Sequence, residues 1–159
     1  MTSMMKRMRV TAAVLLALPL LLSGCGDDEA DGEDITLAQV ASDWTAISVE
    51  YESDFDPNER VDIINDLNGT FDLTIDEDGD YVASINLPGD GIQIDVGTVS
   101  VVNGDQLRFD PDDDAPETAD ARLSNGGNRL TLEFDNAQYD FDGNGSDEEA
   151  NARMILVRL

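Results

Sequence analysis

An acidic, glycine-containing segment near the C-terminus holds the side chains whose spacing most suggests a chemical function. It reads Asp-Phe-Asp-Gly-Asn-Gly-Ser-Asp-Glu-Glu-Ala-Asn over residues 140–151. Calcium-binding loops place oxygen ligands at positions 1, 3, 5, 7, 9 and 12, with a glycine at position 6 for the sharp turn. Counted from residue 140, the first five of these positions hold Asp140, Asp142, Asn144, Ser146 (through its carbonyl) and Glu148. The spacing predicts a metal site, and calcium is the one cofactor that the sequence indicates.

The twelfth position of this loop departs from the calcium pattern. It holds Asn151, where the pattern has a glutamate that binds through both oxygens. A ligand from elsewhere would then complete the site. The alternative is an acidic hairpin turn that binds nothing tightly, because aspartate is abundant throughout the chain.

The residue types that are missing exclude most classes of enzyme. The chain has no histidine, one cysteine (Cys25) and one lysine (Lys6). A Ser-His-Asp triad and a histidine-bound zinc are therefore excluded. Carboxylates and tyrosines are the acid/base groups that remain, and 35 acidic residues make so many chance pairs that no catalytic pair stands out. We expect a protein that is not an enzyme and has no catalytic residue.

The first 24 residues have the pattern of a secretory signal peptide. Lys6, Arg7 and Arg9 precede an apolar run of about 13 residues, Val10–Leu22. This run is too short to cross a hydrocarbon core of about 30 Å, and a basic start followed by a short apolar run is typical of an export signal. We expect the protein to be exported and residues 1–24 to be removed.

The end of this leader resembles the bacterial lipobox. The matching residues are Leu22-Ser23-Gly24-Cys25, directly behind the apolar run. The resemblance implies cleavage before Cys25 and lipidation of its thiol, with two or three acyl chains that hold the protein at a membrane. Gly26 stands where an aspartate would signal retention in the inner membrane, so the outer membrane is favoured. The alternative is an ordinary cleaved signal peptide beside an incidental cysteine.

The charge of the chain limits its partners. The formal net charge is −26, and loss of Lys6, Arg7 and Arg9 with the leader takes it to −29. Such a surface repels phosphate backbones and anionic lipid headgroups, so nucleic acid is not an expected partner. The lipid anchor, not the domain surface, should make the membrane contact. Life in high salt, binding of divalent cations and plain solubility are three explanations for this acidity.

The mature chain divides into a tether and one domain. Residues 25–37 are predicted to form the lipidated start and an acidic, disordered tether. Residues 38–159 carry short segments of alternating apolar and polar residues, separated by turn signals. The predicted strands are 44–51, 70–75, 81–87, 92–96, 98–102, 106–109, 118–124, 129–134 and 152–159. This spacing predicts an all-β fold, an antiparallel up-and-down barrel of about eight strands with one face of each strand buried. A β-sandwich is the alternative.

Two segments of the mature chain favour helix. Residues 35–42 have the apolar spacing of one or two helical turns. Pro57 can start a short helix over 56–68, whose apolar residues are Val61, Ile63, Ile64 and Leu67. This second helix is expected to cover one open end of the barrel.

Residues 38–159 resemble the small lipocalin-like domains of bacterial lipoproteins. The resemblance is carried by Trp44 at the first strand, the Gly69–Thr74 strand, the acidic hairpin up to Tyr81, Gly97-Thr98, and the Asn103–Leu107 hairpin. It implies a lipocalin-like barrel that binds a small apolar or amphipathic molecule in its interior.

Five aromatic residues are candidates for the lining of such an interior site: Trp44, Phe71, Tyr81, Phe109 and Phe134. The alternative is that they simply fill the core. The resulting hypothesis is a non-catalytic, membrane-anchored envelope lipoprotein that binds a small hydrophobic ligand. The second hypothesis is a structural or interaction lipoprotein with an acidic surface that calcium stabilises.

Overall fold

The computed structural model describes residues 34–89 and 91–159. The predicted leader, Cys25 and the tether up to residue 33 lie outside this range. The described elements are α1 (Leu37–Val40), β1 (Ser42–Ser53), β2 (Arg60–Asp62), β3 (Thr70–Ile75), β4 (Asp80–Leu87), β5 (Gly91–Val102), β6 (Gln106–Pro111), β7 (Glu117–Ser124), β8 (Arg129–Tyr139) and β9 (Glu148–Arg158). Within these ranges no helix has the length and apolar character needed to cross a membrane.

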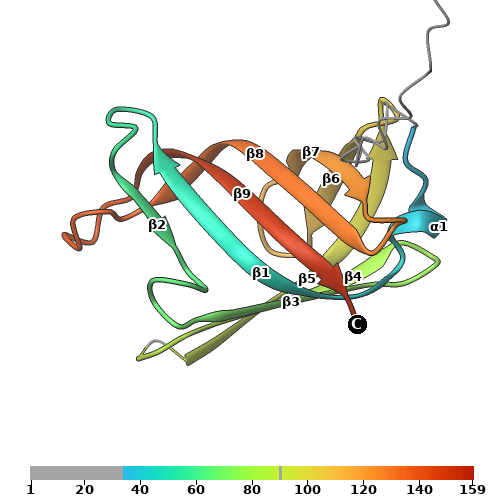
Figure 1. The fold of residues 1–159 in the computed structure, drawn as a ribbon, viewed down its shortest axis with the longest axis horizontal. Helices are drawn as coiled ribbons and strands as arrows, with labels where there is room; N and C mark the ends of the chain where they lie inside the picture. The colour runs from blue at the N-terminus through green and yellow to red at the C-terminus, as the bar shows by residue number, and fades with distance from the viewer. Residues whose placement is uncertain (1–33, 90) are drawn as a thin grey trace, which may run out of the picture.

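The strands form a closed antiparallel barrel. Their order is β2-β1-β3-β4-β5-β6-β7-β8-β9, and β1 also pairs with β9 from Trp44↔Arg158 to Ser53↔Ala150. This last pairing closes an eight-stranded barrel of β1 and β3–β9, with β2 as an additional strand (Figure 1). The lipocalin-like barrel is therefore confirmed, and the β-sandwich alternative is wrong because one continuous sheet closes on itself.

Alternating side chains build the core of this barrel. In β3, Leu73 and Ile75 are buried while Asp72 and Thr74 are exposed. The same alternation in other strands brings together a core that shares one inward face: Trp44, Tyr81, Val99, Leu107, Phe109, Ala119, Leu130, Leu132 and Leu156. Burial of every second residue is the expected pattern of a sheet with one buried face. This alternation is the reason that the strands could be predicted from the sequence.

One end of the barrel is closed by α1 and the residues before it. The indole Nε1 of Trp44 donates to the carbonyl of Val40 at 2.8 Å, and the guanidinium of Arg158 lies 4.6 Å from the centre of the Trp44 ring. Ile35 is buried, and its N–H donates to the carbonyl of Gly104 at 2.6 Å. Of the one or two helical turns predicted over residues 35–42, the structure has a single turn, Leu37–Val40. The predicted tether, residues 25–37, reaches too far, because Ile35 already packs on the barrel.

The helix predicted over residues 56–68 is wrong. The segment instead forms β2 and a series of turns, with Glu50↔Asp62 and Glu52↔Arg60 paired across β1 and β2. Residues 60–62 pair with β1, and Asp62 then begins a single turn: its Oδ1 accepts from the N–H groups of Ile64 at 2.9 Å and Asn65 at 3.1 Å, and its carbonyl accepts from the N–H of Asp66 at 2.8 Å. A residue that caps a turn in this way has an extended backbone itself, so one helix cannot run from Pro57 through Asp62.

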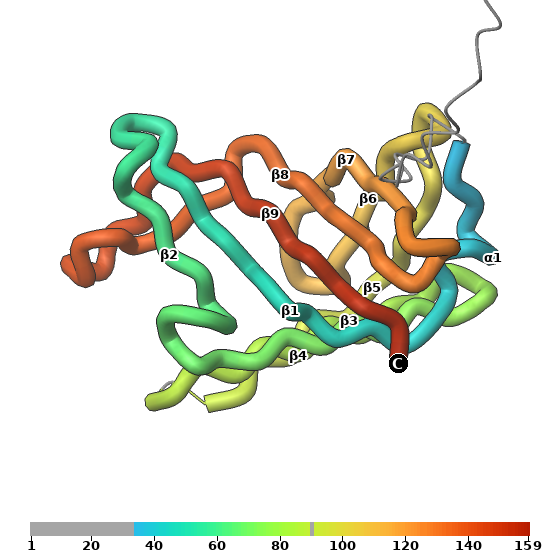
Figure 2. Tube along the Cα trace, viewed as in Figure 1, coloured from blue at the N-terminus to red at the C-terminus, as the bar shows by residue number. Residues whose placement is uncertain are grey.

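β5 is one strand, although the sequence suggested two that are separated by Gly97. The register with β4 is continuous through Tyr81↔Gly97. A side chain at residue 97 would begin 2.8 Å from the Cα of Pro111 on β6. The glycine therefore permits close approach of β6 and does not break the strand. Before Gly97 the hairpin of β4 and β5 leaves the barrel and extends beyond it (Figure 2).

Candidate functional site

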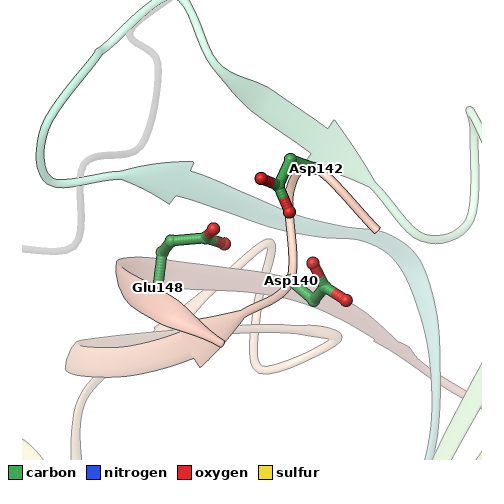
Figure 3. Close-up of side chains that lie close together, drawn as sticks. All are labelled: Asp140, Asp142 and Glu148. Atoms are coloured by element: carbon green, nitrogen blue, oxygen red, sulfur yellow. The ribbon is translucent and has the colours of Figure 1, made fainter. Parts of the chain in front are cut away.

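The loop between β8 and β9 brings three of the predicted calcium ligands together. One carboxylate oxygen from each of Asp140, Asp142 and Glu148 lies within 4.8 Å of the other two. Figure 3 shows these side chains around one side of the loop. The loop lies at the end of the barrel opposite α1 (Figure 1). The spacing in the sequence thus predicted a real convergence of carboxylates.

Backbone N–H groups organise this loop. Asp140 accepts from the N–H of Asn144 at 3.0 Å and of Gly145 at 2.7 Å, and Glu148 accepts from the N–H of Phe141 at 2.9 Å. A carboxylate oxygen has two lone pairs, so these bonds leave acceptor capacity for a cation. The oxygen-only donor set fits a hard cation such as calcium, which takes six to eight oxygen ligands.

The remaining predicted ligands contribute less. The amide oxygen of Asn144 accepts from the N–H of Ser146 at 2.8 Å, and its nitrogen donates to Asp142 at 2.8 Å. The amide nitrogen of Asn151, at the twelfth position, donates to Asp54 at 2.6 Å. Asn151 is therefore engaged with the β1–β2 connection through its amide nitrogen.

The five aromatic candidates occupy different parts of the barrel. Trp44, Tyr81 and Phe109 are buried, while Phe71 and Phe134 are partly buried and pack against the core. The rings of Tyr81 and Phe109 meet edge to face at 5.3 Å, and those of Phe109 and Phe134 are 6.0 Å apart. Trp44 lies beneath α1. Only Phe134 among the five lines the pocket described next.

A pocket of about 450 Å³ lies between β7 and β8, and most of the residues around it are exposed. The two strands pair from Asp120↔Glu133 to Ser124↔Arg129. Beyond this point β8 carries an irregularity between Phe134 and Ala137, which includes Asn136 with a φ of 64°. This bulge bends β8 away from β7. The residues around the pocket are Gln106, Pro116, Glu117, Thr118, Asp120, Glu133, Phe134, Asp135, Asn136 and Ala137.

The lining of this pocket is mainly acidic and includes one aromatic side chain, Phe134. Among the described residues around it, four carry carboxylates and none is basic, and Glu133 pairs with Arg153 at 3.1 Å. Burial of its carboxyl group, together with the charges of Asp114 and Asp95, raises the pKa of Glu117. Burial, followed by the hydrogen bond to Asp95 at 2.6 Å, raises the pKa of Tyr81. A positive charge entering here would relieve repulsion between carboxylates.

The raised pKa of Glu117 leads to a prediction about stability and pH. Above its native pKa the ionised carboxyl opposes folding, so Glu117→Gln is expected to raise the free energy of unfolding at neutral pH by less than about 1 kcal/mol. The gain should shrink as the pH falls through that pKa, because the wild-type carboxyl is then protonated in the folded protein. Urea denaturation across pH measures it. Glu59→Gln, on an exposed loop, is the control, and an equal gain in both variants would contradict the prediction.

Several residues of this region were not identified from the sequence. They include Glu117, Asp95 and the stack of Tyr51 on Tyr139 with ring centres 4.9 Å apart. A signal for the bulge was present: inward apolar residues occupy even positions up to Phe134 and odd positions from Ala137 onward. Such a change of parity within one strand indicates an inserted residue.

Neither a known protein-family model nor a curated protein matches this chain.

Proposed function

We propose that the protein is an exported envelope lipoprotein, anchored by lipid on Cys25, that binds a small molecule in the pocket between β7 and β8. The observation that carries the binding function is the pocket of about 450 Å³ beside Phe134. Sites for small molecules have volumes of about 300–1,000 Å³. The anchoring function is supported by the basic-apolar leader and the Leu-Ser-Gly-Cys sequence that ends at Cys25.

The lining favours an amphipathic ligand. Phe134 offers an apolar wall that continues to Phe109 in the core. Glu117, Asp120 and Asp135 offer acceptors at the rim. A ligand with an apolar body and a cationic or hydrogen-bond-donating end satisfies both parts, because aromatic faces and carboxylates both attract cations.

Mass spectrometry of the protein purified from its own host tests both parts of this proposal. Under native conditions we expect a bound small molecule, and under denaturing conditions a chain that begins at Cys25 and carries acyl groups. Ala137→Phe, which fills the pocket, should abolish the bound mass without changing the anchor. Ala38→Phe, at an exposed position of α1, is the matched control and should retain the ligand.

Each part of the proposal fails on a separate result. An unprocessed N-terminus or an unmodified Cys25 thiol would overturn the anchor. A ligand-free wild-type protein, or equal retention of the ligand by Ala137→Phe and Ala38→Phe, would overturn the binding function of the pocket.

A second candidate function is a structural lipoprotein whose surface is stabilised by calcium. It is supported by the convergence of Asp140, Asp142 and Glu148 on one side of the β8–β9 loop. Bound calcium would connect the ends of β8 and β9 and offset the repulsion among these carboxylates.

Calcium is therefore expected to raise the melting temperature beyond the effect of ionic strength. A ligand at roughly ten times its Kd adds about 1.4 kcal/mol to the free energy of unfolding. Thermal melts in CaCl₂ and in NaCl of equal ionic strength measure this. Asp140→Asn with Asp142→Asn should remove the difference, whereas Asp112→Asn with Asp113→Asn, in another acidic loop, should retain it. Identical wild-type melts in the two salts would exclude the calcium site.

A further inference from the structure

The first half of β5 has an open edge. Residues from Gly97 onward pair with β6, beginning at Gly97↔Pro111, and Val96 accepts from the N–H of Asp112 at 2.9 Å. Residues 91–95 pair with β4 on one side, and no described strand pairs with them on the other. The strands of the barrel are therefore paired on both sides, but residues 91–95 of the protruding β4–β5 hairpin are paired on one side only.

The direction of the free backbone groups follows from the register. Val99 donates its N–H toward β4, to the carbonyl of Gly79, whereas the carbonyl of Val96 points to the β6 side. N–H and C=O groups alternate from side to side along a strand. The N–H and C=O groups of Ile92 and Ile94 therefore point to the open edge, while those of Gln93 and Asp95 bond β4.

The same segment exposes an apolar face. Tyr81 and Val99 mark the buried face of β4 and β5, and the residues of opposite parity face outward. Ile92 is 66% exposed, Ile94 67%, Val96 40% and the neighbouring Val82 46%. An apolar strand with unpaired backbone groups is a template for the addition of another strand.

We propose that residues 91–95 of β5 bind an extended segment of a partner protein, which adds as a strand and carries alternating apolar and basic side chains. Its apolar residues would cover Ile92 and Ile94. Its basic residues would meet Asp95 and the exposed Asp112–Asp114 loop, which begins where the open edge ends.

Charge favours this partner over a second copy of the chain. The chain has a formal net charge of −26, so two copies that approach edge to edge repel each other. A basic strand is attracted by the same charge, and its main-chain hydrogen bonds supply the affinity that charge alone does not.

Hydrogen exchange with a synthetic peptide tests the proposal. The probe is a capped heptapeptide of alternating lysine and valine, added to the purified protein. We expect exchange of the Ile92 and Ile94 amides to slow by about tenfold or more, with little change at Gln93 and Asp95, whose N–H groups already bond β4. Binding should weaken as NaCl rises from about 50 to about 500 mM.

Two protein variants and two peptides supply the controls. Ile94→Pro removes one free-edge donor without removing a bond to β4, and should abolish binding. Ile92→Thr with Ile94→Thr keeps strand propensity and should weaken binding by about tenfold, while Ile47→Thr, an exposed apolar residue on β1, should not. A glutamate-valine heptapeptide and a peptide with all its lysines at one end should not bind.

Several outcomes would overturn this assignment. Equal protection of all four amides would place the peptide elsewhere, as would peptide binding that survives Ile94→Pro. Equal binding of the glutamate-valine peptide would remove the basic partner. A dimer in sedimentation, with Ile92 and Ile94 already protected without peptide, would make a second copy the occupant.

Discussion

Trp44→Ala is expected to lower the free energy of unfolding by about 3–5 kcal/mol, a large share of the total for a domain of this size. Trp44 is 1% exposed and lies where β1 begins, between α1 and the start of the barrel. Its removal leaves a cavity, frees the carbonyl of Val40 from its 2.8 Å hydrogen bond, and deprives Arg158 of its cation–π contact. Urea denaturation followed by far-ultraviolet circular dichroism measures the loss.

Two further variants separate packing from hydrogen bonding at this position. Trp44→Phe keeps an aromatic ring but loses the indole donor, so we expect a smaller loss, of about 1–3 kcal/mol. Leu67→Ala, at a more exposed apolar residue, should cost no more than about 0.5 kcal/mol. A loss for Trp44→Ala no greater than that for Leu67→Ala would show that α1 and Trp44 do not close the barrel.

Gly97→Ala is expected to cost about 3 kcal/mol because β6 passes too close to β5 to admit a side chain. The new methyl group would lie 2.8 Å from the Cα of Pro111 and closer still to the carbonyl oxygen of Asp110. Both neighbours are backbone atoms, so the two strands must separate. Chemical denaturation measures the loss, and increased hydrogen exchange along β6 locates it.

Gly126→Ala is the control for this substitution. Gly126 has a φ of 64° in the β7–β8 turn, and no atom of residues 34–89 or 91–159 outside its own chain neighbours lies within 4 Å of an added Cβ. It should lose about 1–2 kcal/mol from backbone conformation alone. If Gly97→Ala were as mild as an ordinary exposed substitution, close packing of β6 would not be the reason for glycine at this position.

The positions of the strands could be predicted because they depend on local pattern. Thr70–Ile75 was located to the residue, since a clean alternation is bounded by an Asn-Gly pair before it and by an acidic turn after it. The carboxylates of the β8–β9 loop were predicted for the same reason: neighbouring residues in one tight turn must converge. Residues 60–62 show the limit of local pattern, because their pairing with β1 overrode the apolar spacing of a helix.

The faces of the strands could not be predicted in the same way. Ile92, Ile94 and Val96 alternate as cleanly as any core segment, and alternation led us to expect one buried face. The structure turns them outward because Val99, of opposite parity, is the residue that packs inside. Alternation identifies two faces but does not say which one meets the core.

The pocket between β7 and β8 could not be predicted from local sequence pattern. It depends on the bulge after Phe134 and on the end of the β7–β8 pairing at Asp120↔Glu133. The change of parity in β8 was visible in the sequence, but the pocket is also lined by Glu117 of β7 and by Pro116 in the loop before it.

By itself, the sequence determined the all-β class, the places of most strands, the acidic character and the converging carboxylates of the β8–β9 loop. Three features became apparent only from the tertiary structure: the closure of β1 on β9, the pocket beside Phe134 and the unpaired edge at Ile92 and Ile94. The difference arises from the sequence separation of the residues that interact. Alternation and turn chemistry act over a few neighbouring residues, whereas closure, gaps and free edges depend on pairing between residues as distant in the chain as Trp44 and Arg158.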